Sequence, residues 1–343
     1  MALRTRENRP RLRAAVRALT GWALAGTLLL TGVTAGVAAA DDWPTGPIRF
    51  VVFSGVGGSA DRTARAMSTF FPEALGQPVV VINKKGANNQ LGANYLLAQP
   101  PDGNHVGFTA ISPYIATSII VGGAKYTLDD FAFVNGQWTD WDIIAVNKDT
   151  PYQSLPELLE AIKANPKKVR ASLVFGSSGH LTTLLLLEAH GIPAENLNMV
   201  NYDGGGAARA AVAGGQVDFT IIAGEGSVGI KDFIRPLAVV RKDRAEGWDA
   251  PPVNEALSPM GIKVPIILGS MRGMVVPAKF KAQHPDRYQK LVDAYRTTLE
   301  SKDVQKFLGR SGIGADWIGP EETEERVREM AAIFAKYKDV MKE

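Results

Sequence analysis

The segment from Ile48 to Asp61, IRFVVFSGVGGSAD, most strongly constrains how this chain can fold. Apolar, β-favouring residues run directly into a glycine-rich turn, and a helical pattern begins at about Ala60. A strand, a glycine loop and a helix N-terminus in succession can bind an anion, because backbone N–H groups converge there and the helix dipole adds positive potential. The segment therefore predicts an anion-binding loop between a strand and a helix.

Strand and helix patterns alternate along the rest of the chain. The Ser154–Glu157 spacing is that of a capping box, and Gly191 is placed as a helix C-cap. Such alternation predicts an α/β architecture with parallel-rich sheets. Strands are expected at 79–82, 105–109, 142–146, 169–175, 199–202, 217–222 and 234–240, and helices at 181–190, 207–213, 286–300 and 320–337.

The first forty residues have the pattern of an export signal. Six arginines precede an apolar segment at 18–37, and Ala38–Ala40 offers a small-residue cleavage site before Asp41. A retained membrane anchor is the alternative, but no charged stop-transfer flank follows the apolar segment. We therefore expect a signal peptide at 1–40, cleavage near Ala40 and a periplasmic protein.

Charge and cysteine content exclude several classes of function. The whole chain has a net charge of +3, but the first forty residues carry six Arg and one Glu, so the remainder has a net charge of −2. This balance implies no nucleic-acid partner. The absence of cysteine excludes disulfides, thiolate chemistry and a lipoprotein anchor. The four histidines are widely spaced, so no metal site is predicted.

Three further polar loops share the features of the first one. They lie at 175–180, 201–206 and 86–92, and each is rich in Gly, Ser or Asn with few charges. Loops that follow parallel strands are where open α/β sheets bind ligands. The four loops together predict a small polar ligand held by backbone N–H and hydroxyl groups. The alternative for each loop is that its glycines only permit a tight turn.

Two enzymatic interpretations compete with a binding role. Gly55–Ala60 fits a dinucleotide-binding fingerprint, but the next strand ends in Asn83 rather than the acidic residue that would hold a ribose. A serine hydrolase could use Ser177 or Ser178 with His180 and Asp218. However, a Ser and a His so close in sequence at a helix start are poorly placed to contact each other, and no G-x-S-x-G motif is present. We therefore favour a loop-ordering hydrogen bond for His180.

In their order and spacing, a series of short motifs resembles the Bug family, the periplasmic substrate-binding proteins of tripartite tricarboxylate transporters. The resemblance covers almost all of the chain after the expected signal. The motifs are Trp43–Arg49, Gly57–Asp61, Leu75–Asn83, Gly86–Ala93, Pro101–Gly103, Ser177–Leu181, Tyr202–Ala207 and Gly214–Asp218.

The resemblance implies a type II periplasmic-binding-protein fold, in which two α/β lobes enclose a ligand cleft. Lobe 1 would comprise 41–142 plus 274–343, and lobe 2 would comprise 143–273. The Ser54–Ala60 and Ser177–His180 loops would face each other and hold a ligand carboxylate. The expected ligand-binding residues are Ser54, Gly55, Val56, Gly57, Gly58, Ser59, Ala60, Asn89, Thr109, Ser112, Trp138, Ser177, Ser178, His180, Tyr202 and Glu225.

The chain departs from the family pattern at several of these positions. Ser54–Val56 replaces the usual residues before the glycine pair, and an acidic residue, Glu225, follows the strand at 217–222. A Glu225 side chain in the cleft would disfavour a second ligand carboxylate there and favour an amine or hydroxyl. Trp138 or Trp141 could stack on a flat ligand, or both could pack at the hinge between the lobes.

The sequence thus predicts a solute-binding protein, not an enzyme, that needs no cofactor. It would capture a small carboxylate for the membrane subunits of a tripartite tricarboxylate-type transporter, and aromatic or otherwise non-standard carboxylates are among the candidates. We expect a monomer. The alternative is an extracytoplasmic sensor that presents the carboxylate to a sensor kinase, and an exported serine hydrolase ranks third. The sequence names neither the ligand nor the open or closed state.

Overall fold

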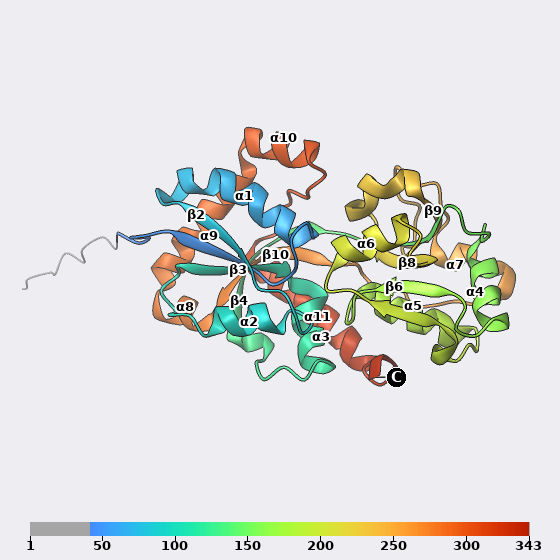
Figure 1. The fold of residues 1–343 in the computed structure, drawn as a ribbon. Coiled ribbons are helices and arrows are strands. Elements are labelled where there is room, and N and C mark those ends of the chain that lie inside the picture. Colours follow the sequence, from blue (N-terminus) through green and yellow to red (C-terminus); the bar gives the residue numbers. More distant parts are fainter. Residues whose placement is uncertain (1–41, 343) are drawn as a thin grey trace, which may run out of the picture. The chain divides into compact units, whose positions relative to one another are not determined.

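Two five-stranded sheets of the same topology organise residues 42–342, the part of the chain that the computed structural model describes (Figure 1). The expected export signal at 1–40 lies outside these residues. The strand order is β2-β1-β3-β10-β4 in the first sheet and β7-β6-β8-β5-β9 in the second. In each sheet three strands run parallel, and a fourth runs antiparallel between the third and the edge strand.

The first sheet is built from both ends of the described chain. Its strands are β1 (Ile48–Val52), β2 (Val79–Asn83), β3 (His105–Ala110), β4 (Phe131–Thr139) and β10 (Met271–Pro277). The helices that accompany it are α1 (Ser59–Leu75), α2 (Gln90–Leu97), α3 (Ile111–Ile120), α8 (Ala278–Gln283), α9 (Pro285–Glu300), α10 (Lys302–Arg310) and α11 (Gly319–Lys336).

The second sheet comes from one continuous stretch. Its strands are β5 (Asp142–Asn147), β6 (Arg170–Leu173), β7 (Asn198–Asn201), β8 (Phe219–Ala223) and β9 (Ile234–Val239). Its helices are α4 (Leu155–Ala164), α5 (Ser178–Ala189), α6 (Gly205–Ala213) and α7 (Val253–Ala256). Short 3-10 segments are η1 (Leu128–Asp130), η2 (Ala194–Asn196), η3 (Glu225–Phe233), η4 (Ser258–Met260) and η5 (Val340–Lys342).

The chain passes between the sheets at two places. The first is the link of two residues between β4 and β5, and the second is the segment between α7 and β10. The lobe boundaries expected from the sequence, at 142/143 and 273/274, lie within a few residues of these strand ends. The mixed α/β architecture with two sheets is that of a type II periplasmic-binding-protein fold, as the sequence predicts.

Each sheet has a hydrophobic core on both faces. Side chains of β1 alternate between the two faces of the first sheet. Phe50 and Val52 pack with α1 and α9 on one face, whereas Val51 packs with α2 and α3 on the other. Because both faces are covered, strands such as β3 and β5 are mostly apolar, which is why the sequence pattern identified them.

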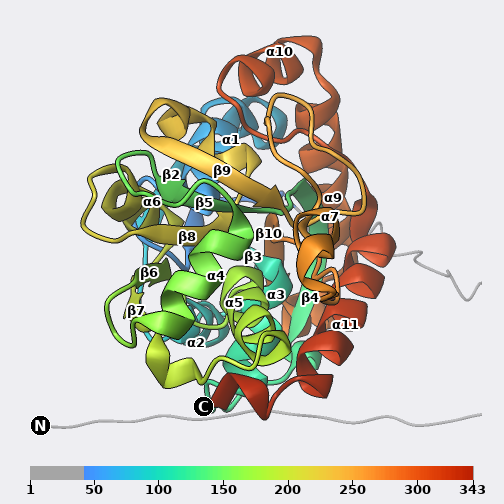
Figure 2. The same ribbon diagram turned by 90° about the vertical axis from the view of Figure 1, so that its right-hand side faces the viewer.

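The C-terminal helix α11 contacts elements of both sheets. It packs beside α3 and β4, and its Met330 and Phe334 join Leu181 and Leu184 of α5 in one apolar cluster. Figure 2 shows α11 along the side of α3 and β4, with the chain end near α5. Among residues 42–342, no helix combines the length and apolar character needed to span a bilayer.

Several expected element boundaries differ from the structure. Strand β6 ends at Leu173 rather than 175, because the chain turns at Gly176, whose φ is +76°. Helix α5 begins at Ser178 rather than 181, because the Ser177 hydroxyl accepts the His180 N–H and caps the helix there. The sequence pattern did not predict β4, β10, α2 or α3. In β4 the buried polar residues Asn135 and Gln137 interrupt the apolar pattern.

Candidate functional site

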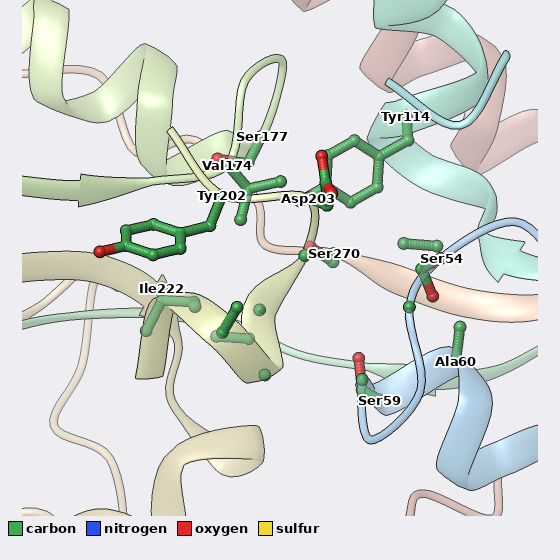
Figure 3. Close-up of a pocket in the computed structure, with 18 of the residues that line it drawn as sticks. Ser54, Ser59, Ala60, Tyr114, Val174, Ser177, Tyr202, Asp203, Ile222 and Ser270 are labelled. Atoms are coloured by element: carbon green, nitrogen blue, oxygen red, sulfur yellow. The ribbon is translucent and has the colours of Figure 1, made fainter. Parts of the chain in front are cut away.

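A cavity of about 700 Å³ lies between loops of the first sheet and loops of the second. Figure 3 shows Ser54, Ser59 and Ala60 on one side of it and Val174, Tyr202 and Ile222 on the other. The walls come mainly from segments that follow β1, β6 and β7, where polar loops of the sequence lie, and from the last three residues of β8. The carboxyl ends of parallel strands thus form the pocket in both sheets.

Hydrogen bonds of Asp61 and Asn83 fix the conformation of the loop after β1. Asp61 accepts the Gly57 N–H at 2.9 Å and the Arg65 Nε at 3.0 Å. The Asn83 amide donates to Asp61 at 2.9 Å and to the Ser54 carbonyl at 3.0 Å. Asn83 stands where a dinucleotide site would carry an acid, and here it fixes the shape of the glycine loop instead.

The loop before α5 is ordered by its own side chains. Ser177 accepts the His180 N–H at 3.0 Å, and His180 Nδ1 accepts the Gly176 N–H at 3.3 Å. Burial lowers the pKa of His180 to about 4, so the ring is neutral at physiological pH. His180 therefore orders the loop, and its Nδ1 is already engaged.

Three helix N-termini meet at the cavity. The first residues of α1, α5 and α6 all line it, among them Ser59, Ser178 and Gly205. Unpaired N–H groups and the positive end of the helix dipole favour an anion at each of these ends. The convergence gives the cavity a positive potential that does not depend on ionisable side chains.

Two buried arginines add formal positive charge to the wall. Arg209 of α6 donates from Nε to the Ser227 hydroxyl at 2.9 Å and from Nη2 to the Ala223 carbonyl at 3.4 Å. Burial lowers the pKa of Arg209 to about 10, which still leaves it cationic at neutral pH. Arg272 of β10 donates to Ser59 Oγ at 2.9 Å and to Asp140 at 3.2 Å.

Three polar side-chain atoms in the lining are buried without a hydrogen-bond partner among residues 42–342. They are Ser54 Oγ, Ser178 Oγ and Asp142 Oδ2. Buried polar atoms are nearly always paired, so unpartnered groups on a pocket wall indicate contacts that a ligand or water completes.

Ten of the ligand-binding residues expected from the sequence line the cavity. They are Ser54, Gly55, Val56, Gly58, Ser59, Ala60, Asn89, Ser177, Ser178 and Tyr202. The other six, Gly57, Thr109, Ser112, Trp138, His180 and Glu225, lie outside the lining. Gly57 donates its N–H to Asp61. Thr109 and Ser112 are buried in β3 and α3.

Trp138 and Glu225 contact each other rather than the cavity. The Trp138 Nε1 donates to Glu225 Oε2 at 3.1 Å, and the indole is 1% exposed. The guanidinium groups of Arg62 and Arg272 lie 5.2 Å and 4.8 Å from its ring centre. Trp141 packs edge-on against Trp248. The structure therefore places both Trp138 and Trp141 in packing around the crossing between the sheets, not against the cavity.

Sequence reasoning missed Arg209, Arg272, Asp142 and Tyr114 as lining residues. A signal existed for Arg209, because it lies one turn into the helix that follows the predicted loop at 201–206. No local sequence pattern could identify Arg272 as a lining residue, since β10 reaches the cavity only through sheet pairing with β3 and β4.

The residues proposed for a serine hydrolase, Ser177 or Ser178 with His180 and Asp218, do not form a hydrogen-bonded catalytic triad. His180 Nδ1 accepts a backbone N–H, and Asp218 pairs with Arg170 at 2.9 Å. Ser178 Oγ has no hydrogen-bond partner among residues 42–342. A catalytic triad requires serine, histidine and carboxylate in hydrogen-bonded sequence, which these contacts do not provide. Within the same residues no cluster of His, Cys, Asp or Glu could hold a metal ion.

Two α/β lobes with a polar pocket between their loops define a periplasmic binding protein of type II. Residues 63–336 match the model of the tripartite tricarboxylate transporter family receptor, TctC, and the chain belongs to that family. The Bug-family resemblance of the sequence motifs is thereby confirmed.

Similar proteins include members that carry the Bug name. Protein BugT of Bordetella pertussis is 31% identical over 235 residues, which cover 65% of this chain and 70% of BugT. A protein from the gbd 5′ region of Cupriavidus necator is 26% identical over 87% of this chain and 90% of its own length.

Solved structures match over most of the chain. A periplasmic transporter structure matches with a TM-score of 0.71 and 26% identity, covering 87% of this chain and 97% of that one. MatC from Rhodopseudomonas palustris, solved with bound malate, matches with a TM-score of 0.73 and 23% identity, covering 87% of this chain and all of MatC. At that identity the likeness to MatC supports the fold alone.

Proposed function

We propose that this protein captures a small carboxylate in the periplasm and delivers it to the membrane subunits of a tripartite tricarboxylate-type transporter. The observation that carries the proposal is the convergence of three helix N-termini and Arg209 on one cavity. This set of donors suits an oxyanion, because it offers N–H groups and positive potential together. Family membership supports the same role.

The proposed ligand contacts are the lining residues of the two facing loops, together with Arg209. Ser54–Ala60 would hold the ligand from lobe 1, and Ser177 and Ser178 would hold it from lobe 2. The lobes, proposed as 41–142 plus 274–343 and as 143–273, would close on the ligand by bending at the two crossing segments. Stronger binding to the closed form would then signal occupancy to the transporter.

A thermal-shift screen of the purified protein tests the proposal. Mono- and dicarboxylates, including malate, are compared with neutral amides of the same carbon skeletons. A ligand at 100 times its Kd stabilises the folded state by about 2.7 kcal/mol, which raises the melting temperature measurably. We expect at least one carboxylate to do so and its amide not to. If no carboxylate shifts the melting temperature, the proposal is wrong.

A matched pair of variants localises the binding. Arg209→Gln removes a buried cation from the cavity and is expected to weaken carboxylate binding by about tenfold or more, as charge-assisted hydrogen bonds do. Arg310→Gln removes an exposed cation at the end of α10 and should leave Kd unchanged. Calorimetric titration gives both values. Equal Kd for the wild type and Arg209→Gln would contradict binding at this cavity.

A further inference from the structure

Asp142 is fixed at the cavity wall by the backbone of the second sheet. It is the first residue of β5, pairs with Ala223 of β8, and its carbonyl accepts the Val240 N–H at 2.8 Å. The following residues, 143–146, are fully buried in the two cores of that sheet. The carboxyl group therefore projects from a rigid element, which is the arrangement that a specific contact needs.

One oxygen of this carboxyl group has no partner. The Asp142 side chain is almost wholly buried, its residue being 2% exposed, yet Oδ2 makes no hydrogen bond to any of residues 42–342. The neighbouring lining atom Ser178 Oγ is likewise unpartnered. A buried carboxylate oxygen that accepts no hydrogen bond is costly, so a ligand group that donates to Asp142 Oδ2 would be favoured at this side of the cavity.

The carboxyl groups of two other buried aspartates near the cavity, Asp140 and Asp61, accept several hydrogen bonds from the protein, unlike Asp142 Oδ2. Asp140 accepts from Trp141 and Glu225 N–H groups at Oδ1, and from Gly226 N–H and Arg272 at Oδ2. Asp61 accepts from a backbone N–H, an arginine and an amide. Both are committed to the protein, whereas Asp142 keeps an acceptor for a molecule in the cavity.

Each of the two arginines of the cavity wall keeps one guanidinium nitrogen without an acceptor among the described residues. Arg272 donates from Nε to Ser59 and from Nη1 to Asp140 and the Ser270 carbonyl, and its Nη2 donates to none of them. Arg209 uses Nε and Nη2, and its Nη1 donates to no acceptor among the described residues. Two cations with a spare donor and one acid with a spare acceptor therefore line the same cavity.

We propose that Asp142 is a specificity-determining residue, which accepts a hydrogen bond from a hydroxyl or ammonium group on the carboxylate ligand. The ligand carboxylate would lie at the helix N-termini and Arg209, and the donor group would lie at Asp142 and Ser178. This inference rests on the proposed function. It predicts that a substituted carboxylic acid is bound in preference to the unsubstituted acid of the same chain length.

The ionisation of Asp142 is consistent with this role. Burial raises its pKa to about 7, and Asp140 acts in the same direction. The positive charges of Arg272 and Arg209 oppose the shift, as does the nearby Ser178 hydroxyl, which approaches the carboxyl group without reaching hydrogen-bond geometry. Tyr114, whose pKa is also raised by burial, is the other titratable group that interacts with it. An ammonium group at Oδ2 would favour the carboxylate form, whereas a second ligand carboxylate would be repelled by it.

Calorimetric titration with matched acids tests the proposal. Each set has the same chain with hydrogen, hydroxyl or ammonium at one carbon: propionate, lactate and alanine; succinate, malate and aspartate; glutarate, 2-hydroxyglutarate and glutamate. In the wild type we expect the hydroxy or amino member of the set that binds to have a Kd at least about tenfold below that of the unsubstituted member.

Three variants assign the preference to Asp142. Asp142→Ala should abolish the preference for the substituted acid, whether the wild type prefers the hydroxy or the amino member. Asp142→Asn retains a carbonyl acceptor, so a hydroxyl preference should survive in this variant and an ammonium preference should be lost. Asp149→Asn, an exposed position beyond the other end of β5, should leave all Kd values unchanged. If Asp142→Ala does not fold, Asp142→Leu, which has a similarly branched side chain and no acceptor, takes its place and should likewise abolish the preference.

The outcomes separate the two proposals. If none of these acids binds, the proposed function fails and this inference fails with it. If carboxylates bind but the wild type shows no preference for the substituted member, only the role of Asp142 is overturned. A preference that persists in Asp142→Ala, or that falls equally in Asp149→Asn, overturns it as well.

Discussion

Arg272 donates from Nη1 to the Asp140 carboxylate at 3.2 Å, and both side chains are almost wholly buried. Asp140 lies in the link from β4 to β5, and Arg272 lies in β10, where the chain has returned to the first sheet. Asp140 also accepts the Glu225 and Gly226 N–H groups, which are the first two of η3. The ion pair therefore joins the first connecting segment to the strand that follows the second one.

We predict that Arg272→Met strongly destabilises the protein. The substitution preserves much of the side-chain volume but leaves Asp140 buried without its cation, a change that typically costs about 3–5 kcal/mol. Urea unfolding measures the loss. The double variant Arg272→Met/Asp140→Asn should recover part of it, because the uncompensated charge is gone. A loss below about 0.5 kcal/mol in Arg272→Met would mean that the pair does not stabilise this region.

Because the His180 side chain is buried, we predict that the free energy of unfolding falls as the pH is lowered. Burial lowers its pKa to about 4 in the folded protein, against about 6.5 in an unfolded chain. The unfolded state therefore binds this proton at higher pH than the folded state does, so stability is lost as pH falls from about 6.5 to about 4. The full difference corresponds to about 3 kcal/mol.

The comparison of wild type with His180→Gln isolates this contribution. The glutamine cannot titrate, so its unfolding free energy should fall less between pH 7 and pH 4.5 than that of the wild type. His284→Gln, an exchange at a partly exposed histidine, serves as the control. Parallel pH profiles for wild type and His180→Gln would show that His180 does not titrate as its burial implies.

We predict that the ion pair between Lys85 and Asp203 favours closure of the two lobes over the ligand. Lys85 follows β2 in the first sheet, Asp203 follows β7 in the second, and their charged atoms are 3.4 Å apart. Both side chains are more than half exposed, so the pair contributes at most about 1 kcal/mol. Lys85→Glu should therefore weaken ligand binding by about two- to fivefold, since it places like charges on the two rims.

Charge exchange and salt provide the control for this pair. Lys85→Glu/Asp203→Lys should restore the wild-type Kd, and the effect of Lys85→Glu should shrink at 1 M salt, where the Debye length is about 3 Å. Titrations at low and high salt measure both. If the double variant binds no better than Lys85→Glu, the contact does not help to close the cleft.

The start of α5 packs so closely against β8 that we predict position 179 tolerates only glycine. A Cβ atom at this position would lie 1.9 Å from the Ile221 carbonyl oxygen of β8, a backbone atom that cannot move alone. Gly179→Ala should destabilise the protein by about 3 kcal/mol and weaken ligand binding, because it displaces the adjacent Ser177 and Ser178. Gly309→Ala in α10, with nothing within 4 Å, should instead be neutral or stabilise by about 0.5–1 kcal/mol. Similar melting temperatures for both variants would refute this constraint.

The sequence predicted the elements whose signals are local. Strands β1, β2, β3 and β5 are mostly apolar runs, and α9 has its apolar residues at helical spacing, so their positions follow from the chain itself. The glycine loop after β1 was likewise identified, because loop chemistry and the following helix start are adjacent in sequence. Strand β4 was not predicted, because its polar Asn135 and Gln137 are satisfied by carbonyl groups of residues 314–316, about 180 positions away.

The candidate site shows the same division. The sequence by itself determined the backbone-rich part of the pocket: the loops at Ser54–Ala60 and Ser177–Ser178, since a glycine or serine before a helix creates N–H donors locally. Only the tertiary structure decided the charged part, because Arg272, Asp142 and Arg209 come to one cavity through strand pairing and helix packing. It also turned Trp138 and Glu225 toward each other, since the indole N–H and the carboxylate satisfy one another where the sheets connect.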